Sequence, residues 1–188
     1  MDRPPFVPFP KIPRLRRHIT ITEKIDGSNA QIVITGDGRA LAGSRNRWIT
    51  PEDDNFGFAR WVHEHHDELV SGLGKGQHFG EWWGSGIQRG YGLTVGEKRF
   101  SLFNTHRWSR KLDVPATHPP ACCGVVPVLY TGPYSDSAIQ DAITLLSMNG
   151  SSAMPGFMDP EGVVVYMHAS GSLHKVLIKG DDLPKGAV

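Results

Sequence analysis

The stretch His18–Asn29, HITITEKIDGSN, decides the fold. β-branched residues alternate with other residues along its first half, a pattern typical of a strand with one buried face. Gly27 interrupts that pattern, and Gln31–Thr35, a GDG turn and a return through Ala42 then predict a hairpin. Lys24 is therefore expected in a loop between antiparallel strands.

Short strands outnumber helices in the rest of the chain. Apolar residues between 55 and 73 lie on one helical face, and SDSAIQDAITLLSM (135–148) predicts a second helix. The predicted strands are QHFGEWWG (77–84), KRFSLFNTH (98–106), CCGVVPVLY (122–130), EGVVVYMH (161–168) and SLHKVLIKG (172–180). This order predicts an α+β fold, mainly antiparallel sheets with flanking helices, in a single domain over residues 1–188 without a C-terminal accessory domain.

Length and composition are those of a soluble globular protein. The 188 residues are 39% hydrophobic and 21% charged, and no apolar run approaches the roughly 20 residues of a membrane span. The proline-rich, basic N-terminus lacks the features of a secretory signal, and the adjacent Cys122 and Cys123 are poorly placed to bridge. We therefore expect a cytoplasmic protein with no membrane partner. A net charge of +1 excludes binding of nucleic acid by bulk attraction, but not by a local basic patch.

Lys24, within KIDG, is a candidate nucleophile. An amine attacks phosphorus only in its neutral form, which nearby cations or partial burial favour. Candidate cations are Arg45, Arg47, Lys175 and Lys179. Taken alone, the motif fits a solvated lysine in a surface turn better than a nucleophile.

Further segments form an ordered series with this motif. They are KIDG (24–27), FGE (79–81), FSLF (100–103), EGVV (161–164) and Lys175 with Lys179. The series resembles the covalent nucleotidyltransferase superfamily of ligases and capping enzymes, over nearly the whole chain. EKIDGSN, SRNR and FGEWWGSGIQRG are most similar to RNA ligases of the phage and RNA-editing type. The resemblance implies the ligase adenylation fold and a lysyl-AMP intermediate, formed from ATP at Lys24 with Mg²⁺ or Mn²⁺.

The resemblance also implies a role for each matched residue. Glu81 would accept hydrogen bonds from the ribose hydroxyls, and Phe103 would stack on the adenine. Glu161 would bind the divalent cation, which prefers oxygen ligands. The alternatives are a surface carboxylate, a core phenylalanine and an exposed loop acid. Glu23 and Ile25, on either side of the lysine, are expected among the ATP-binding residues.

The basic residues of the last motif are harder to assign. Lys175, Leu177 and Lys179 share one face of a strand if its side chains alternate, so both lysines could neutralise the α-phosphate. The family more often spaces these lysines two apart, and Lys179 fits a solvated turn equally well. Lys185 is a further candidate.

Three more residues are candidates from the same resemblance. Arg45 matches the arginine that grips phosphate with a forked guanidinium. Arg47 could share that work or bind the 5′-phosphate of a nucleic acid. Asn29 is expected to contact ATP and matches a position tied to strand sealing. Trp82 and Trp83 fit either the wall of a pocket or the core.

The expected partner is RNA, with DNA as the alternative, carrying 5′-phosphate and 3′-hydroxyl ends. A DNA ligase or a GTP-using capping enzyme would share the lysine chemistry. A non-catalytic nucleic-acid-binding module would keep the fold without covalent AMP. Family members usually carry a second domain, so an accessory protein is a candidate replacement for it.

Overall fold

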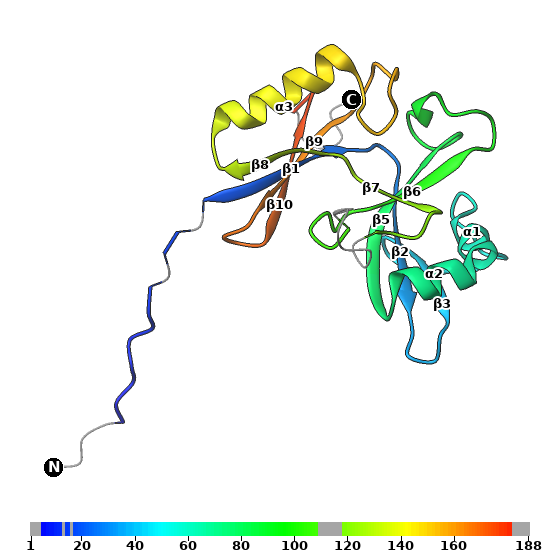
Figure 1. The fold of residues 1–188 in the computed structure, drawn as a ribbon, viewed down its shortest axis with the longest axis horizontal. Helices are drawn as coiled ribbons and strands as arrows, with labels where there is room; N and C mark the ends of the chain where they lie inside the picture. The colour runs from blue at the N-terminus through cyan, green and yellow to red at the C-terminus, as the bar shows by residue number, and fades with distance from the viewer. Residues whose placement is uncertain (1–4, 13, 16, 109–117, 182–188) are drawn as a thin grey trace.

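The computed structural model describes residues 5–12, 14–15, 17–108 and 118–181 (Figure 1). The elements are, in chain order, β1 His18–Lys24, β2 Ser28–Ile34, β3 Ala40–Ser44, β4 Trp48–Ile49, α1 Phe58–Glu64, α2 His66–Leu73, β5 Gly76–Gly84, the 3-10 turn η1 Gly90–Gly92, β6 Lys98–Leu102, β7 Cys123–Val125, β8 Val128–Pro133, α3 Asp136–Asn149, β9 Gly162–Met167 and β10 Ser172–Leu177.

These strands form two sheets. One has the order β10-β9-β1-β8 and the other β4-β3-β2-β5-β6-β7, and neighbours are antiparallel except for the parallel pair β6 and β7. Figure 1 shows α3 lying over the first sheet, with α1 and α2 against the second. The predicted α+β fold is confirmed. In the part of the chain that is described, no helix is long and apolar enough to cross a membrane.

The first sheet buries one face against α3. Ile19 and Ile21 are fully buried on β1, and the helix places Ala138, Ala142 and Leu146 on a single face toward them. The predicted helix begins where the sequence indicates, because the hydroxyl of Ser135 accepts a hydrogen bond from the backbone N–H of residue 138 (3.1 Å). The buried face of β1 and the apolar face of α3 thus pack together in one core.

The second sheet packs on the two short helices. The Phe58 ring lies 5.3 Å from that of Trp82 and 5.1 Å from that of Phe100, so this tryptophan belongs to the core. Trp83 is also buried, in a third apolar cluster. The helix predicted between 55 and 73 is present but divided at His65, whose φ of −104° and ψ of 18° interrupt the regular helix.

The chain crosses between the sheets at two places, and two predictions fail there. CCGVVPVLY was expected to be one strand, but it contributes β7 to the second sheet and β8 to the first. The change occurs at Val126, whose N–H bonds to the carbonyl of Leu102 (3.1 Å), and Pro127, whose carbonyl accepts the N–H of Glu23 (2.9 Å). Likewise β1 and β2 were expected to flank one loop as antiparallel neighbours, but they belong to different sheets.

The first crossing, from β1 to β2, passes so close to β5 that it requires a glycine at position 27. A Cβ at this position would lie 2.5 Å from the carbonyl oxygen of Trp82 and 2.8 Å from Cβ of Trp83. Any side chain would therefore push the turn after Lys24 away from β5.

We expect Gly27→Ala to lower the free energy of unfolding by about 1–3 kcal/mol, since the methyl group overlaps backbone that cannot move freely. Urea denaturation measures this loss. Gly36→Ala is the matched control, because its Cβ would meet only the mobile end of Lys75 at 3.4 Å. Equal stability of the two variants would contradict the tight crossing.

Candidate functional site

A cleft of about 1680 Å³ opens between the two sheets beside this crossing. Residues of both sheets and of their connecting loops line it. The sequence-predicted residues among them are Glu23, Lys24, Ile25, Asn29, Arg45, Glu81, Phe103 and Lys175. Residues from distant parts of the chain thus share one cavity, which is large enough for a nucleotide.

Lys24 and Glu161 form the closest ion pair of this site. Lys24 is the last residue of β1, and its backbone partner on β9 is Gly162, the residue after Glu161. The ammonium Nζ lies 2.5 Å from Oε2 of the carboxylate, and the two side chains are only 26% and 16% exposed. The nucleophile candidate therefore lines the cleft as a partly buried, paired lysine rather than a lysine in a solvated turn.

A chain of hydrogen bonds runs along the opposite wall. Nδ2 of Asn29 donates to Oε2 of Glu81 (3.0 Å), and Oδ1 of Asn29 accepts from Nε of Arg45 (2.8 Å) and also from its Nη2. Asn29 lies opposite Glu81 in the β2–β5 register. Three residues predicted to contact ATP are therefore connected directly, and Asn29 orients both charged partners.

Glu81 has a strongly perturbed acidity. Burial raises its pKa from 4.5 to about 7, against the opposing effects of the Lys24 charge and of hydrogen bonds from Gly27 and Asn29. The nearby Glu161 carboxylate raises it further. Because the unfolded state binds fewer protons than the folded state between pH 4.5 and 7, stability falls as the pH rises through that window.

We expect Glu81→Gln to stabilise the protein at pH 8 by roughly 3 kcal/mol and to have little effect near pH 4, since one pKa unit corresponds to about 1.4 kcal/mol. Glutamine keeps an acceptor for Asn29 and removes the charge. Urea denaturation of both proteins at several pH values measures the difference. Glu97 is partly exposed, its pKa is lowered by its hydrogen bond from Arg99, and it supplies the control: Glu97→Gln should show no such gain between pH 5 and 8. A pH-independent effect of Glu81→Gln would contradict the proposed titration.

Two phenylalanines face the cleft. Phe103 follows β6 directly and is 41% exposed, so it is not a core residue. Its N–H bonds to the carbonyl of Phe79 (3.0 Å), whose side chain is also exposed and lines the cleft. The sequence motifs predict no role for Phe79. Strand alternation could have found it, because Phe79 and Glu81 lie on one face of β5.

The two lysines of the last motif, Lys175 and Lys179, lie at different places in the structure. Lys175 lies on β10 opposite Val164 and lines the cleft. The expected shared strand face is wrong for Lys179, because β10 ends at Leu177. Lys179 does not line the cleft; it is 76% exposed and its Nζ lies 2.7 Å from Oδ1 of Asp159. Lys185 is outside the described residues.

Glu23 and Ile25 turn away from the cleft. The Glu23 carboxylate is buried on the α3 side, where it accepts hydrogen bonds from Ser151 Oγ (2.6 Å) and from the N–H groups of Ser152 and Ala153 (both 2.8 Å). Ile25 is buried in the third apolar cluster. Both residues still line the cleft, and their predicted contacts with ATP stay predictions.

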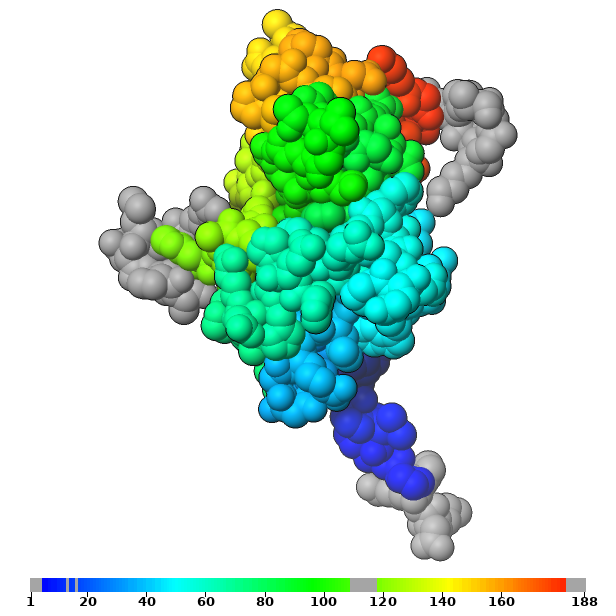
Figure 2. Space-filling model, turned by 90° about the vertical axis from the view of Figure 1, so that its right-hand side faces the viewer, coloured from blue at the N-terminus to red at the C-terminus, as the bar shows by residue number. Residues whose placement is uncertain are grey.

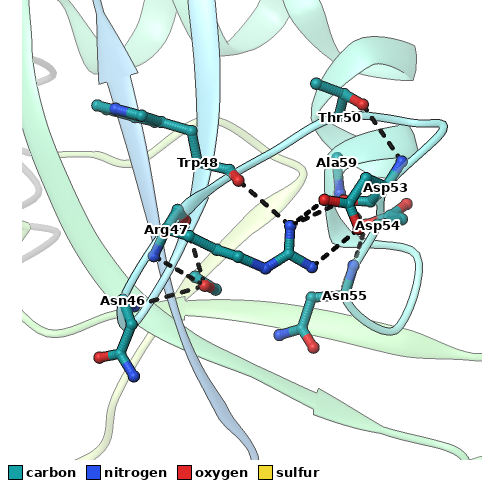
Figure 3. Close-up of polar contacts among 9 residues, drawn as sticks. Asn46, Arg47, Trp48, Thr50, Asp53, Asp54, Asn55 and Ala59 are labelled. Atoms are coloured by element: carbon teal, nitrogen blue, oxygen red, sulfur yellow. Dashed lines mark hydrogen bonds and ion pairs between the residues drawn. The ribbon is translucent and has the colours of Figure 1, made fainter.

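Arg47 forms hydrogen bonds and an ion pair outside the cleft. Figure 3 shows its guanidinium between the Trp48 carbonyl and the Asp53 carboxylate, with Nη2 donating to Oδ1 of Asp53 at 3.1 Å and Nη1 to Oδ2. The neighbouring Asp54 instead accepts the N–H of Ala59, in the first turn of α1 (2.8 Å). Arg47 therefore does not share the position of Arg45, and its contact with a 5′-phosphate stays a prediction.

A divalent cation at this site would need ligands from substrate or water in addition to the protein side chains. Glu161 offers hard carboxylate oxygens beside Lys24. Across the described residues, no group of three or more His, Cys, Asp or Glu side chains could hold a metal ion. Mg²⁺ or Mn²⁺ would therefore take its other ligands from substrate phosphates and water, as Mg²⁺ commonly does.

Comparison with solved structures identifies the fold. RNA ligase variants from Naegleria gruberi resemble the chain: an apo form with TM-score 0.58 at 18% identity, a form with ATP and Mn with TM-score 0.60 at 17% identity, and a form with AMP and Mn with TM-score 0.57 at 17% identity. The matches cover 86%, 87% and 86% of this chain and 49%, 50% and 49% of those chains, respectively. The chain thus spans about half the length of these ligases.

Sequence comparison identifies the family. The sequence profile of RNA ligases matches residues 17–179. The chain therefore belongs to the RNA ligase family, as its ordered motifs predicted. No curated protein matches it in sequence.

Proposed function

We propose that this chain is an ATP-dependent, RNA ligase-like nucleotidyltransferase that forms a covalent lysyl-AMP intermediate at Lys24. The observation that carries the proposal is the Lys24–Glu161 pair, with Nζ 2.5 Å from Oε2, in which Lys24 lines the same cleft as Glu81, Arg45 and Phe103. A buried acid, an exposed aromatic ring and a phosphate-binding arginine match the parts of a nucleotide.

The parts of ATP are distributed along the cleft in this proposal. The exposed face of Phe103 takes the adenine by stacking. Glu81 accepts hydrogen bonds from the ribose hydroxyls, and Arg45, oriented by Asn29, binds phosphate oxygens with its fork. Lys175 neutralises charge that develops on the α-phosphate.

The proposed first step exchanges one bond for another. The neutral Nζ of Lys24 forms a bond to the α-phosphorus, the bond to the bridging oxygen breaks, and pyrophosphate leaves with that electron pair. A proton passes from Nζ to solvent. A divalent cation held by Glu161 would supply charge neutralisation for the phosphates. Separation of Lys24 from Glu161 must precede attack, since the ion pair occupies the amine.

The later steps follow from membership of the RNA ligase family. AMP would pass to the 5′-phosphate of an RNA end, and a 3′-hydroxyl would then displace AMP and seal the strands. The matched ligases are about twice as long as this chain. We therefore propose residues 17–179 as the adenylation unit, with strand sealing aided by further protein, in cis or as an accessory partner.

Incubation with α-labelled ATP and Mg²⁺ or Mn²⁺, followed by denaturing electrophoresis, tests the first step. We expect acid-labile label on the wild-type chain and none on Lys24→Ala, because a phosphoramidate needs the amine. Lys75→Ala, a lysine outside the cleft lining, is the matched control and should label normally. Absence of label on the wild type would sink the proposal in favour of a non-catalytic binding module, and equal label on Lys24→Ala would show that Lys24 is not the residue that carries AMP.

The substrate is tested by competition. We expect ATP to label at least about tenfold faster than GTP, and RNA nicks to be sealed in preference to DNA nicks. GTP preference would indicate capping-type chemistry, and DNA preference a DNA ligase. Gel assays of labelling and joining measure both ratios.

A further inference from the structure

A line of charged residues lies outside the Lys24–Glu161 pair and joins four distant segments. Nε of Arg89 donates to Oδ2 of Asp26 (2.9 Å), and its Nη1 donates to Oδ2 (2.6 Å) and the backbone oxygen (3.1 Å) of Asp159. Lys179 completes the line on the other carboxylate oxygen of Asp159. The expected catalytic chemistry uses neither Arg89 nor Asp159.

The position of this line in the chain is informative. Asp26 follows Lys24 by two residues, and Asp159 precedes Glu161 by two residues. Arg89 therefore ties together the same two segments that the Lys24–Glu161 ion pair joins. When ATP enters and that ion pair separates, the Arg89 bridge is left to hold the two segments at their spacing.

The loop that carries Arg89 is itself firmly placed. The fully buried Tyr91 accepts the N–H of Asp26 at its hydroxyl (3.0 Å), and its ring stacks on Phe157 at 4.5 Å. Gln88 and Tyr91 adopt positive φ values of 43° and 52°, which non-glycine residues keep only where the surroundings hold them. Figure 2 shows this loop, in green, packed against the orange segment that precedes β9.

An arginine suits this bridge better than a lysine. Its planar guanidinium offers separate N–H donors to two carboxylates at once, whereas an ammonium is a single point of charge. The side chains of Arg89 and Asp26 are 30% and 24% exposed, so solvent screens their pair less than it screens the surface pair of Lys179.

We infer that Arg89 is a positioning residue for lysyl-AMP formation, which sets the distance between the Lys24 turn and the segment bearing Glu161 through Asp26 and Asp159. The inference rests on the proposed function. The inference also assigns a role to Lys179. Its ammonium orients the Asp159 carboxylate by binding Oδ1, which leaves Oδ2 for Arg89. Neither Arg89 nor Asp159 contacts the nucleotide in this scheme.

Single-turnover labelling with α-labelled ATP, measured across ATP concentrations, tests the inference. We expect Arg89→Met to lower the maximal labelling rate by about 10²-fold, the size of effect that a displacement near 1 Å produces. The half-saturating ATP concentration should change less than about threefold, because the residues assigned to ATP are intact. Arg89→Lys should recover only part of the rate, since it keeps the charge and loses the fork.

The controls separate positioning from loss of structure. Arg39, like Arg89, forms an ion pair with an aspartate, Asp37, but it lies in the exposed turn after β2. Arg39→Met should therefore label at the wild-type rate. Asp159→Asn breaks the same bridge from a half-exposed side chain, which makes it the second test if Arg89→Met does not fold. The double variant should be no slower than the slower single variant, because both changes remove one bridge.

Two failures are distinguishable in this assay. If the wild type acquires no label, the proposed function itself is wrong. If the wild type labels while folded Arg89→Met and Asp159→Asn label at its maximal rate, or if only the half-saturating ATP concentration rises, the positioning role is overturned and the proposed function stands.

Discussion

The structure depends on the close passage of the chain between two sheets at Ile25–Gly27. Only a residue without a side chain fits there, because a Cβ on Gly27 would come within 2.5 Å of the Trp82 carbonyl. The passage places the end of β1 directly beside β5, so Lys24 from one sheet faces Glu81 from the other. The cleft exists where it does because two separately packed sheets must meet at this short connection.

Because side chains alternate along β1, the adjacent residues Glu23 and Lys24 point to opposite faces of the strand. Glu23 points to the α3 side, where one hydroxyl and two backbone N–H groups satisfy its buried carboxylate. Burial raises the pKa of Glu23 and the hydrogen bonds lower it. Lys24, one residue later, points into the cleft. Anchoring Glu23 to the 151–153 segment therefore also fixes the direction of the neighbouring lysine, since a strand cannot turn one side chain without turning the next.

Charge around the lysine is arranged in two layers. Glu161 and Glu81 lie nearest to it, and their like charges together with burial keep the pKa of Glu81 near 7. Arg89 and Asp159 form the outer layer: Arg89 pairs with the carboxylates of Asp26 and Asp159, and neither Arg89 nor Asp159 lines the cleft. In the proposed function, the inner contacts change when ATP binds, whereas the outer ones can persist.

The sequence by itself determined the local and ordered features: the alternating strand before KIDG, the capped helix after Ser135, the α+β class and the series of motifs that predicts membership of the RNA ligase family. It could do so because alternation, capping and motif order depend on neighbours in the chain. Only the tertiary structure decided that β7 and β8 separate at Pro127, that Arg47 turns to Asp53 while Arg45 enters the cleft, that Lys179 stays outside, and that Arg89 joins Asp26 to Asp159. Those outcomes depend on which distant segments meet across the two sheets, and no local pattern specifies such meetings.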